Sequence, residues 1–243
     1  MKKLYSVFLG LALAAMCQFS LAAPAVVTEL VGTAQRIPDG AAPIALKNGD
    51  AINERDTVQT GENSGVVLRF EDGQRATIGA SSRMTVNAYT YDLKDPAKSN
   101  VLLSLLTGSM RAITGLIGKS RPDKVAFRAG TATIGIRGTD VTFATTGGDV
   151  VVSVNDGVIS FTFGGRTVEV QRGQAVLTQN GQLTQGTIEA IKKAVEQNPG
   201  LNKALESVNT SALQSATQQA AAASLQPVST QNPAQQTCGA SCN

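Results

Sequence analysis

Short runs of alternating apolar and polar residues fill the chain from Val26 to about Leu183, and Gly, Asn and Asp turn signals separate them. Alternation with a period of two is typical of strands that bury one face. The pattern therefore predicts an all-β domain over residues 26–185, built of short antiparallel strands and hairpins. Either a β-sandwich or a stacked β-roll would cover the apolar faces of such strands, and the sequence does not discriminate between them.

The loop at residues 71–73 sets the register of one predicted hairpin. A three-residue loop pairs Leu68 with Ala76 and Val66 with Ile78, so that apolar side chains share a face. A two-residue turn would place apolar residues opposite polar ones, because a slip of one residue sends every side chain to the other face. We therefore predict the three-residue loop, with its glycine in the left-handed position.

A second group of turns is predicted further along the chain. A two-residue Asp156-Gly157 turn pairs Val154 with Ile159, and the further pairs on that face are apolar as well. A Gly164-Gly165 turn then sets Ile159 opposite Val170. The pattern predicts a three-strand meander.

The apolar register slips by one residue in the middle of one predicted strand. Ile134 and Ile136 share one parity, whereas Val141 and Phe143 share the other. An extra residue with positive φ would absorb this slip as a β-bulge, and glycine adopts positive φ at little cost. We therefore interpret the Arg137-Gly138-Thr139 step as a bulge that redirects the strand.

The same step carries a resemblance to a known family. GIRGTD, residues 135–140, follows a run of the form L-x-x-G-D-x-I-x-x-x-D-x-V-x-T-G-x-x-S-x-V-x-L-x-F-x-D-G from Leu46 to Gly73. In this combination the chain resembles the FecR (ferric-citrate regulator) periplasmic domain family over roughly residues 31–176. The resemblance implies a role like that of the periplasmic part of FecR-type sensors, which relay occupancy of an outer-membrane receptor. The chain lacks the cytoplasmic anti-sigma segment and the membrane helix that such a relay needs, so we expect a stand-alone module that binds a ligand or a protein.

The apolar spacing becomes helical after Gly186. Apolar residues recur at helical spacing over residues 187–208, with Asn198-Pro199-Gly200 as a break, which predicts two short amphipathic helices. No charged residue follows Glu206, and Ala, Gln, Ser and Thr dominate. We predict that residues 209–243 form a disordered, low-complexity tail.

The N-terminus has the pattern of a secretory signal peptide. Two lysines precede an apolar run, and Ser20-Leu21-Ala22 offers small residues at the cleavage positions. We predict that residues 1–22 are removed by cleavage after Ala22 and that the protein is periplasmic or secreted. The alternative is a lipoprotein anchored through Cys17, which we rank lower because Met16 occupies a position where such motifs have a small residue. No segment reaches the roughly 20 apolar residues of a membrane span.

Two cysteines remain after that cleavage, Cys238 and Cys242. We predict a disulfide between them, since Gly239 permits the tight turn that so short a loop needs. A metal site would need more ligands than two thiols, and the chain has no histidine. We expect neither a metal nor a cofactor.

Charge is unevenly distributed along a nearly neutral chain. Without residues 1–22 the chain has 19 basic and 18 acidic residues, a formal charge of +1. Residues 111–137 alone contain six basic residues and one acid. This segment predicts a surface for an acidic envelope protein or an anionic envelope component, and the loop with Lys119, Arg121 and Lys124 is its densest part. The simpler interpretation, which the sequence favours, is that this loop is a solvated connection. Export and the near-zero net charge disfavour nucleic acid.

The bulge itself supplies further candidate binding residues, namely Arg137, Gly138, Thr139 and Asp140. As a contact residue, Arg137 would bind a partner's carboxylate with two hydrogen bonds, because its guanidinium is planar. The sequence favours the structural interpretation, in which Arg137 pairs with Asp140 or another acid and fixes the bulge.

Catalysis has little support in the sequence. The chain offers no histidine as a base and no phosphate-cradling glycine loop before a helix. Most candidate carboxylates lie beside turns, where Asp is expected for local hydrogen bonding; they are Asp50, Asp56, Glu71, Asp72 and Asp140. We therefore predict a non-enzymatic, exported envelope module that binds another envelope protein or a ligand. The alternative is a structural or assembly protein of the cell surface that associates with copies of itself.

Overall fold

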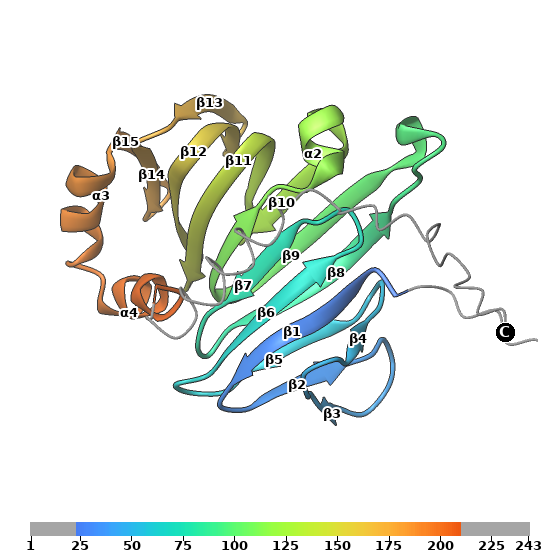
Figure 1. Cartoon of the computed structure of the whole chain (residues 1–243). Helices are drawn as coiled ribbons and strands as arrows, with labels where there is room; N and C mark the ends of the chain where they lie inside the picture. The colour runs from blue at the N-terminus through green and yellow to red at the C-terminus, as the bar shows by residue number, and fades with distance from the viewer. Residues whose placement is uncertain (1–22, 210–243) are drawn as a thin grey trace, which may run out of the picture.

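The computed structural model describes residues 23–209, and its strands form one continuous hydrogen-bonded sheet of 15 strands (Figure 1). The strands of the first half are β1 (Ala25–Val31), β2 (Ala34–Ile37), β3 (Ile44–Ala45), β4 (Ala51–Ile52), β5 (Thr57–Thr60), β6 (Gly65–Phe70), β7 (Arg75–Ile78) and β8 (Arg83–Thr90). Those of the second half are β9 (Asn100–Ile113), β10 (Val125–Ala129), β11 (Ala132–Thr146), β12 (Asp149–Phe163), β13 (Arg166–Gln171), β14 (Gln174–Gln179) and β15 (Gln182–Thr187). The predicted all-β class is confirmed.

The helices of the described part are short. They are α2 (Leu116–Ser120), α3 (Ile188–Val195) and α4 (Pro199–Ser207), with two 3₁₀ turns, η1 (Pro96–Lys98) and η2 (Pro122–Lys124). Among the residues that the structure describes, no helix has the length and apolar character needed to cross a membrane. The predicted signal peptide, the predicted tail and the three cysteines lie outside the described residues.

The sheet folds over on itself because three long strands, β9, β11 and β12, each run through two layers. Residues 108–113 of β9 pair with β7 and β11, whereas residues 100–107 pair with β8 and β10. Strands β11 and β12 divide in the same way, near residues 138 and 157. We call the layer that contains β1, β4, β6, β7, β14 and β15 the helix-covered layer. The layer that contains β2, β3, β5, β8, β10 and β13 is the groove layer.

A glycine with positive φ stands at the dividing point of each long strand. Gly108 in β9 has φ +90°, Gly138 in β11 has φ +59° and Gly157 in β12 has φ +81°. Only glycine adopts this region readily, so the three positions let the strands bend without a strained side chain. The register between β11 and β12 shifts between Arg137 and Asp140, which confirms the predicted bulge.

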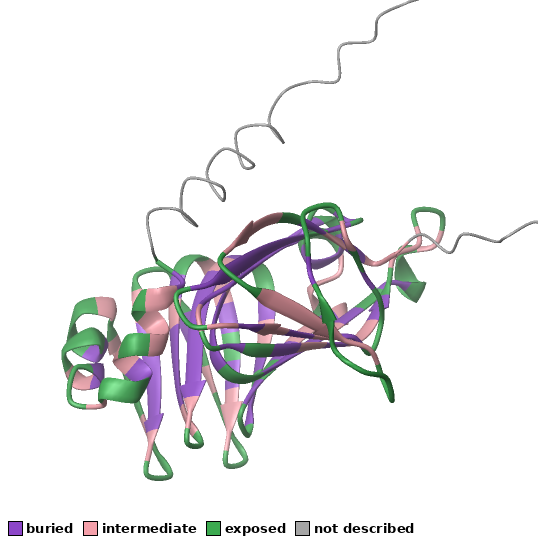
Figure 2. Ribbon diagram, turned by 90° about the horizontal axis from the view of Figure 1, so that it is seen from below, coloured by how far each residue is buried: buried purple, intermediate pink, exposed green. Residues whose placement is uncertain are grey.

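The main core lies between the two layers. Phe127 of the groove layer stacks on Phe143 of the helix-covered layer with ring centroids 5.7 Å apart, and Phe70 packs on Tyr89 at 5.2 Å. Each pair joins the layers, and all four side chains are buried. Figure 2 shows the buried residues (purple) concentrated on the strands, while the loops and helix surfaces are exposed. The architecture is therefore sandwich-like in its core, although one sheet supplies both layers.

The hairpin predicted at Asp156-Gly157 is wrong. These residues lie inside β12, where Val154 pairs with Val141 and Ile159 with Ile136. A hairpin and a bent strand that pairs with a long neighbour have the same pattern of apolar residues. In both, the residues on either side of Asp156-Gly157 point into the same core. The other two registers are confirmed: the loop at 71–73 pairs Leu68 with Ala76, and the Gly164-Gly165 turn pairs Ile159 with Val170.

The two predicted amphipathic helices are confirmed as α3 and α4, which pack on the outer face of the helix-covered layer. The Thr187 side chain accepts a hydrogen bond from Ala190 N at the start of α3, and Asn198 caps α4 by accepting from Leu201 N. The buried apolar residues of the helices and of the strands beneath them form a second cluster, separate from the main core: Ala144, Val151, Ala175, Leu177, Ile191, Val195 and Leu201. The result is three layers, with the helices on one side and the groove layer on the other.

Candidate partner-binding surface

Asp140 is held by two neighbouring strands of the helix-covered layer. Arg111 of β9 donates two hydrogen bonds to the carboxylate, from Nε to Oδ1 at 2.9 Å and from Nη2 to Oδ2 at 2.6 Å. Asn155 of β12 donates a third, to Oδ1, at 3.2 Å. The hydrogen bonds to Asp140 raise the pKa of the Arg111 guanidinium, because they favour its charged form. This half-buried network joins β9, β11 and β12 immediately after the bulge.

Thr139 and Gly138 also have structural roles. Thr139 is buried, its N–H donates to Thr114 Oγ1 at 2.8 Å, and its carbonyl accepts from both Thr114 N and Thr114 Oγ1. Gly157 faces the bulge so closely that a Cβ there would overlap the carbonyl oxygen of Gly138. These contacts tie the bulge to β9 and β12.

Arg137 alone of the four bulge residues presents an exposed, unengaged side chain. The predicted alternative, an ion pair with Asp140, is not formed, because Arg111 holds that carboxylate. The bulge separates the two side chains: Arg137 pairs with Val158 in the groove layer, whereas Asp140 pairs with Asp156 in the helix-covered layer. No hydrogen bond or ion pair engages the guanidinium in the described part of the chain, so it is available to a partner.

A broad groove of about 930 Å³ runs beside Arg137 on the outer face of the groove layer. Its floor is a row of small side chains in register across three strands, with Ala126 of β10 opposite Gly135 of β11 and Gly135 opposite Ser160 of β12. Ser160 fills the space that a Cβ on Gly135 would occupy. Small residues on adjacent strands leave the backbone accessible, which permits close approach of another chain.

The walls of the groove come from β13, η2 and β11. Glu169 pairs with Ser160 and lines one side, Pro122 and Asp123 of η2 line another, and Arg137 lies on β11. The groove therefore has a basic side chain on one strand and an acidic side chain two strands away. This arrangement suits a partner segment that carries both signs of charge.

The predicted basic loop lies at the rim of this groove. Arg121 forms a bidentate ion pair with Asp123, at 3.1 and 3.0 Å, which raises the pKa of Arg121 and lowers that of Asp123. Lys119 and Lys124 flank this pair on α2 and η2, and none of the three basic residues lines the groove. The sequence thus located the basic region but missed that a local acid compensates one of its charges.

Two of the turn carboxylates have the local roles expected of them. Asp72 is buried and accepts hydrogen bonds from Gln74 N and from Ile117 N, so it anchors α2 to the loop before β7. The Tyr89 hydroxyl contacts the same carboxylate at 3.2 Å, and burial raises the pKa of Tyr89 above its usual range. Asp56 accepts from Asn53 N and pairs with Arg36.

Sequence reasoning missed Glu169 and Ser160 as neighbours of Arg137. Ser160 lies on the part of β12 that pairs with β11 beyond the bend, and Glu169 lies on β13, which pairs with that part of β12. The predicted hairpin had removed this bend. A recognisable signal was present in the Gly164-Gly165 turn, because that turn sets Ser160 opposite Glu169.

A comparison with family models agrees with the resemblance. Residues 56–160 match the family model described as FecR protein. Two crystal structures of a proposed anti-sigma factor from Parabacteroides distasonis ATCC 8503 are similar in fold, with 14% identity and a TM-score of 0.44. The similarity covers 58% of this chain and 64% and 63% of those chains, so this chain spans less than two thirds of their length. A comparison with curated proteins gave no match.

The matched range begins at the residue before β5 and ends within β12, and it includes the whole Arg137 bulge together with the floor of the groove. The predicted resemblance is confirmed over this range. Over residues 56–160 the chain therefore matches the FecR domain, the family that its motifs resemble.

Proposed function

We propose that this protein is a non-enzymatic signalling module of the cell envelope that binds a partner protein through the groove beside Arg137. FecR domains are regulatory domains that act in envelope signalling, and they are typically periplasmic. The observation that carries the proposal is the exposed Arg137 guanidinium, which no described residue engages although it lies inside the matched range. A charged group of this kind gains most from a partner carboxylate, because two parallel hydrogen bonds match the guanidinium geometry.

The geometry of the groove favours an extended segment of the partner. Ala126, Gly135 and Ser160 form a floor without bulky side chains, and Arg137 and Glu169 stand on different strands beside it. A partner segment with an acidic and a basic side chain would satisfy both charges. Such complementary pairs contribute specificity and association rate more than affinity.

The capped edge of β13 supports side-chain recognition in the groove over self-association by strand pairing. Strand β13 pairs only with β12, so its other side is an edge. The Gln185 side chain donates to the Glu169 carbonyl at 2.9 Å, and the Gln171 N–H donates to the Gln174 side chain at 3.0 Å. Occupied edge groups disfavour strand addition. We expect a monomer in size-exclusion chromatography with light scattering, and an ordered multimer would favour the assembly role instead.

Arg137→Ala tests the groove as a partner site. The mature protein, immobilised, would capture partners from an envelope extract, and the captured protein would then be purified for affinity measurement. Loss of a charged hydrogen-bonded contact should weaken binding about 10- to 100-fold. The melting temperature should not change, because Arg137 has no ion pair to lose.

Arg128→Ala is the matched control. Arg128 is exposed on the neighbouring strand β10 and does not line the groove. Its substitution by alanine removes the same charge as Arg137→Ala. Ser160→Tyr provides a second, steric test, since it fills the floor from an exposed position. If Arg137→Ala and Ser160→Tyr both bind the partner with the affinity of the wild type, the groove is not the site.

We also propose that the chain acts outside the cytoplasm after removal of residues 1–22. N-terminal sequencing of the protein from an envelope fraction should begin at Ala23. A lipid-modified N-terminus at Cys17 would instead show the lipoprotein alternative.

A further inference from the structure

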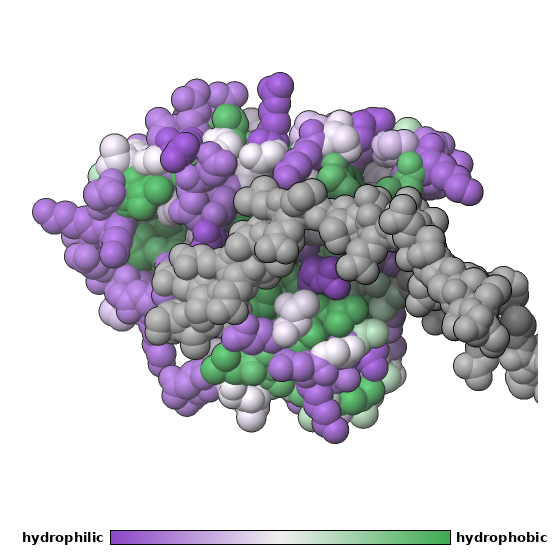
Figure 3. Space-filling model, viewed as in Figure 1, coloured by the Kyte–Doolittle hydropathy of each residue, from purple (hydrophilic) through white to green (hydrophobic). Residues whose placement is uncertain are grey.

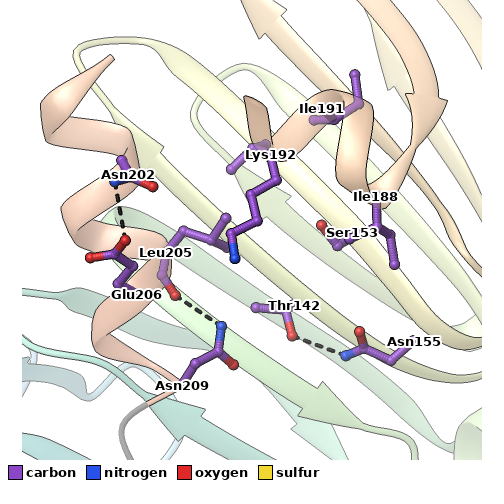
Figure 4. Close-up of a pocket in the computed structure, with 11 residues that line it drawn as sticks. Thr142, Ser153, Asn155, Ile188, Ile191, Lys192, Asn202, Leu205, Glu206 and Asn209 are labelled. Atoms are coloured by element: carbon purple, nitrogen blue, oxygen red, sulfur yellow. Dashed lines mark hydrogen bonds between the residues drawn. The ribbon is translucent and has the colours of Figure 1, made fainter. Parts of the chain in front are cut away.

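A second pocket lies between the two C-terminal helices and the helix-covered layer. Helices α3 and α4 are joined by a short turn, and between them Ser153 and Asn155 of β12 remain partly exposed (Figure 4). The pocket has a volume of about 440 Å³. This size falls within the range of about 300–1,000 Å³ that is usual for small-molecule sites.

The pocket has an apolar end and a polar end. Val151 and Ile191 are buried at one end, and Leu205 packs beside them. Towards the other end Ser153 and then Asn155 further along β12 line the floor, and Ile188 of α3 lies beside them (Figure 4). Figure 3 shows apolar surface (green) bordered by hydrophilic side chains (purple) on the side of the molecule where α3 and α4 lie. A ligand with one apolar and one polar end would match this gradient.

Two opposite charges face the pocket from different helices. Lys192 of α3 extends its ammonium group into the space between the helices, and Glu206 of α4 lines the opposite side (Figure 4). None of the ion pairs in the described part of the chain includes either residue. The Glu206 carboxylate accepts one hydrogen bond, at Oε1 from Asn202 Nδ2 at 3.2 Å. The ammonium group and the second carboxylate oxygen are therefore available to a ligand.

We propose that this pocket binds a small zwitterion with an apolar side chain, that is, an aliphatic α-amino acid. The ligand carboxylate binds the Lys192 ammonium, the ligand ammonium binds Glu206, and the side chain packs between Ile191 and Leu205. A ligand with both charges pairs with both helices at once, and hydrogen bonds between charged groups are stronger than neutral ones. The helices that carry the two charges lie outside the range matched by the FecR model, whereas the floor of the pocket on β11 and β12 lies within it. The pocket shares no lining residue with the groove beside Arg137.

The floor of the pocket also connects it to the bulge. The Asn155 amide group donates to Thr142 Oγ1 at 3.1 Å and to Asp140 Oδ1 at 3.2 Å. A ligand that contacts Asn155 would thus be one hydrogen bond from the Arg111–Asp140 pair.

Calorimetric titration of the mature protein with L-leucine, L-valine and L-methionine tests the proposal. Two analogues of leucine separate the charges: 4-methylpentanoate lacks the ammonium group, and 3-methylbutylamine lacks the carboxylate. We expect at least one of the amino acids to bind and each analogue to bind about 10-fold or more weakly. If none of the amino acids binds at about 10 mM, or if both analogues bind as tightly as leucine, the proposal is wrong.

Lys192→Met and Glu206→Gln should each weaken amino-acid binding about 10-fold or more. Lys193→Met and Glu196→Gln are the matched controls, since both residues are exposed and neither lines the pocket. All four residues are exposed, so each of the four variants should remain folded, with a melting temperature close to that of the wild type. Equal losses in the test and control variants would overturn the proposal.

Discussion

Gly157→Ala tests the bend that divides β12 between the two layers. Gly157 has φ +81°, and a Cβ there would overlap the Gly138 carbonyl oxygen and lie 2.8 Å from the Thr139 side chain. The left-handed backbone costs a non-glycine residue about 1–2 kcal/mol. Relief of the overlap must move β11, and overpacking of this kind adds about 1–3 kcal/mol. We expect Gly157→Ala to lower the free energy of unfolding by about 2–5 kcal/mol.

Gly165→Ala is the matched control because it separates the two causes. Gly165 has φ +77°, and nothing lies within 4 Å of a Cβ built there. Its substitution should therefore lower the free energy of unfolding only by the cost of the left-handed backbone, about 1–2 kcal/mol. Gly138→Ala, with φ +59° and open space, should resemble it. All three alanine variants carry the same change in composition.

Equilibrium unfolding in urea, followed by circular dichroism, measures these differences. The comparison also distinguishes the bent strand from the hairpin that the sequence suggested at Asp156-Gly157. In an exposed hairpin turn, Gly157 would be equivalent to Gly165, and the two substitutions would cost the same. Equal destabilisation of the two variants would therefore refute the close approach of β11 and β12 at the bend.

Three further predictions concern other parts of the fold. Asp140→Asn should lower the free energy of unfolding in urea by about 1–3 kcal/mol, as it disrupts a half-buried bidentate pair, whereas Asp123→Asn, in the more exposed pair, should change it little. Leu201→Ala should lower the free energy of unfolding by about 2–5 kcal/mol because Leu201 is the fully buried residue of α4, and Leu116→Ala, at 56% exposed, should lower it little; a similar loss for both would contradict the packing of α4. Burial raises the pKa of Tyr89 in the folded state, so the folded protein retains a proton that the unfolded chain releases above about pH 10. Stability should therefore fall as the pH rises above about 10, and the fall should be smaller in Tyr89→Phe, as unfolding curves across that range would show.

Local sequence determined most of the elements correctly. The two-residue period identified an all-β chain, and the glycines at residues 73, 164 and 165 set two hairpin registers that the structure confirms. The parity slip at Gly138 located the bulge, because a change of face must appear in the order of apolar residues. The capping residues Thr187 and Asn198 lie where the helical spacing begins. These features depend on neighbours in the chain, so they can be read directly.

The surfaces of the molecule depend on the tertiary structure. The alternation of Val154 and Ile159 fits both a hairpin and a bent strand, and only pairing with the long strand β11 selects the bend. Likewise, Asp140 stands three residues from Arg137 but pairs with Arg111, which is 29 residues away, because the bulge places the two neighbours in different layers. The sequence by itself determined the all-β class, the bulge and the resemblance to the FecR family. Only the tertiary structure decided which charges are compensated and which remain available, since that depends on residues brought together from distant strands.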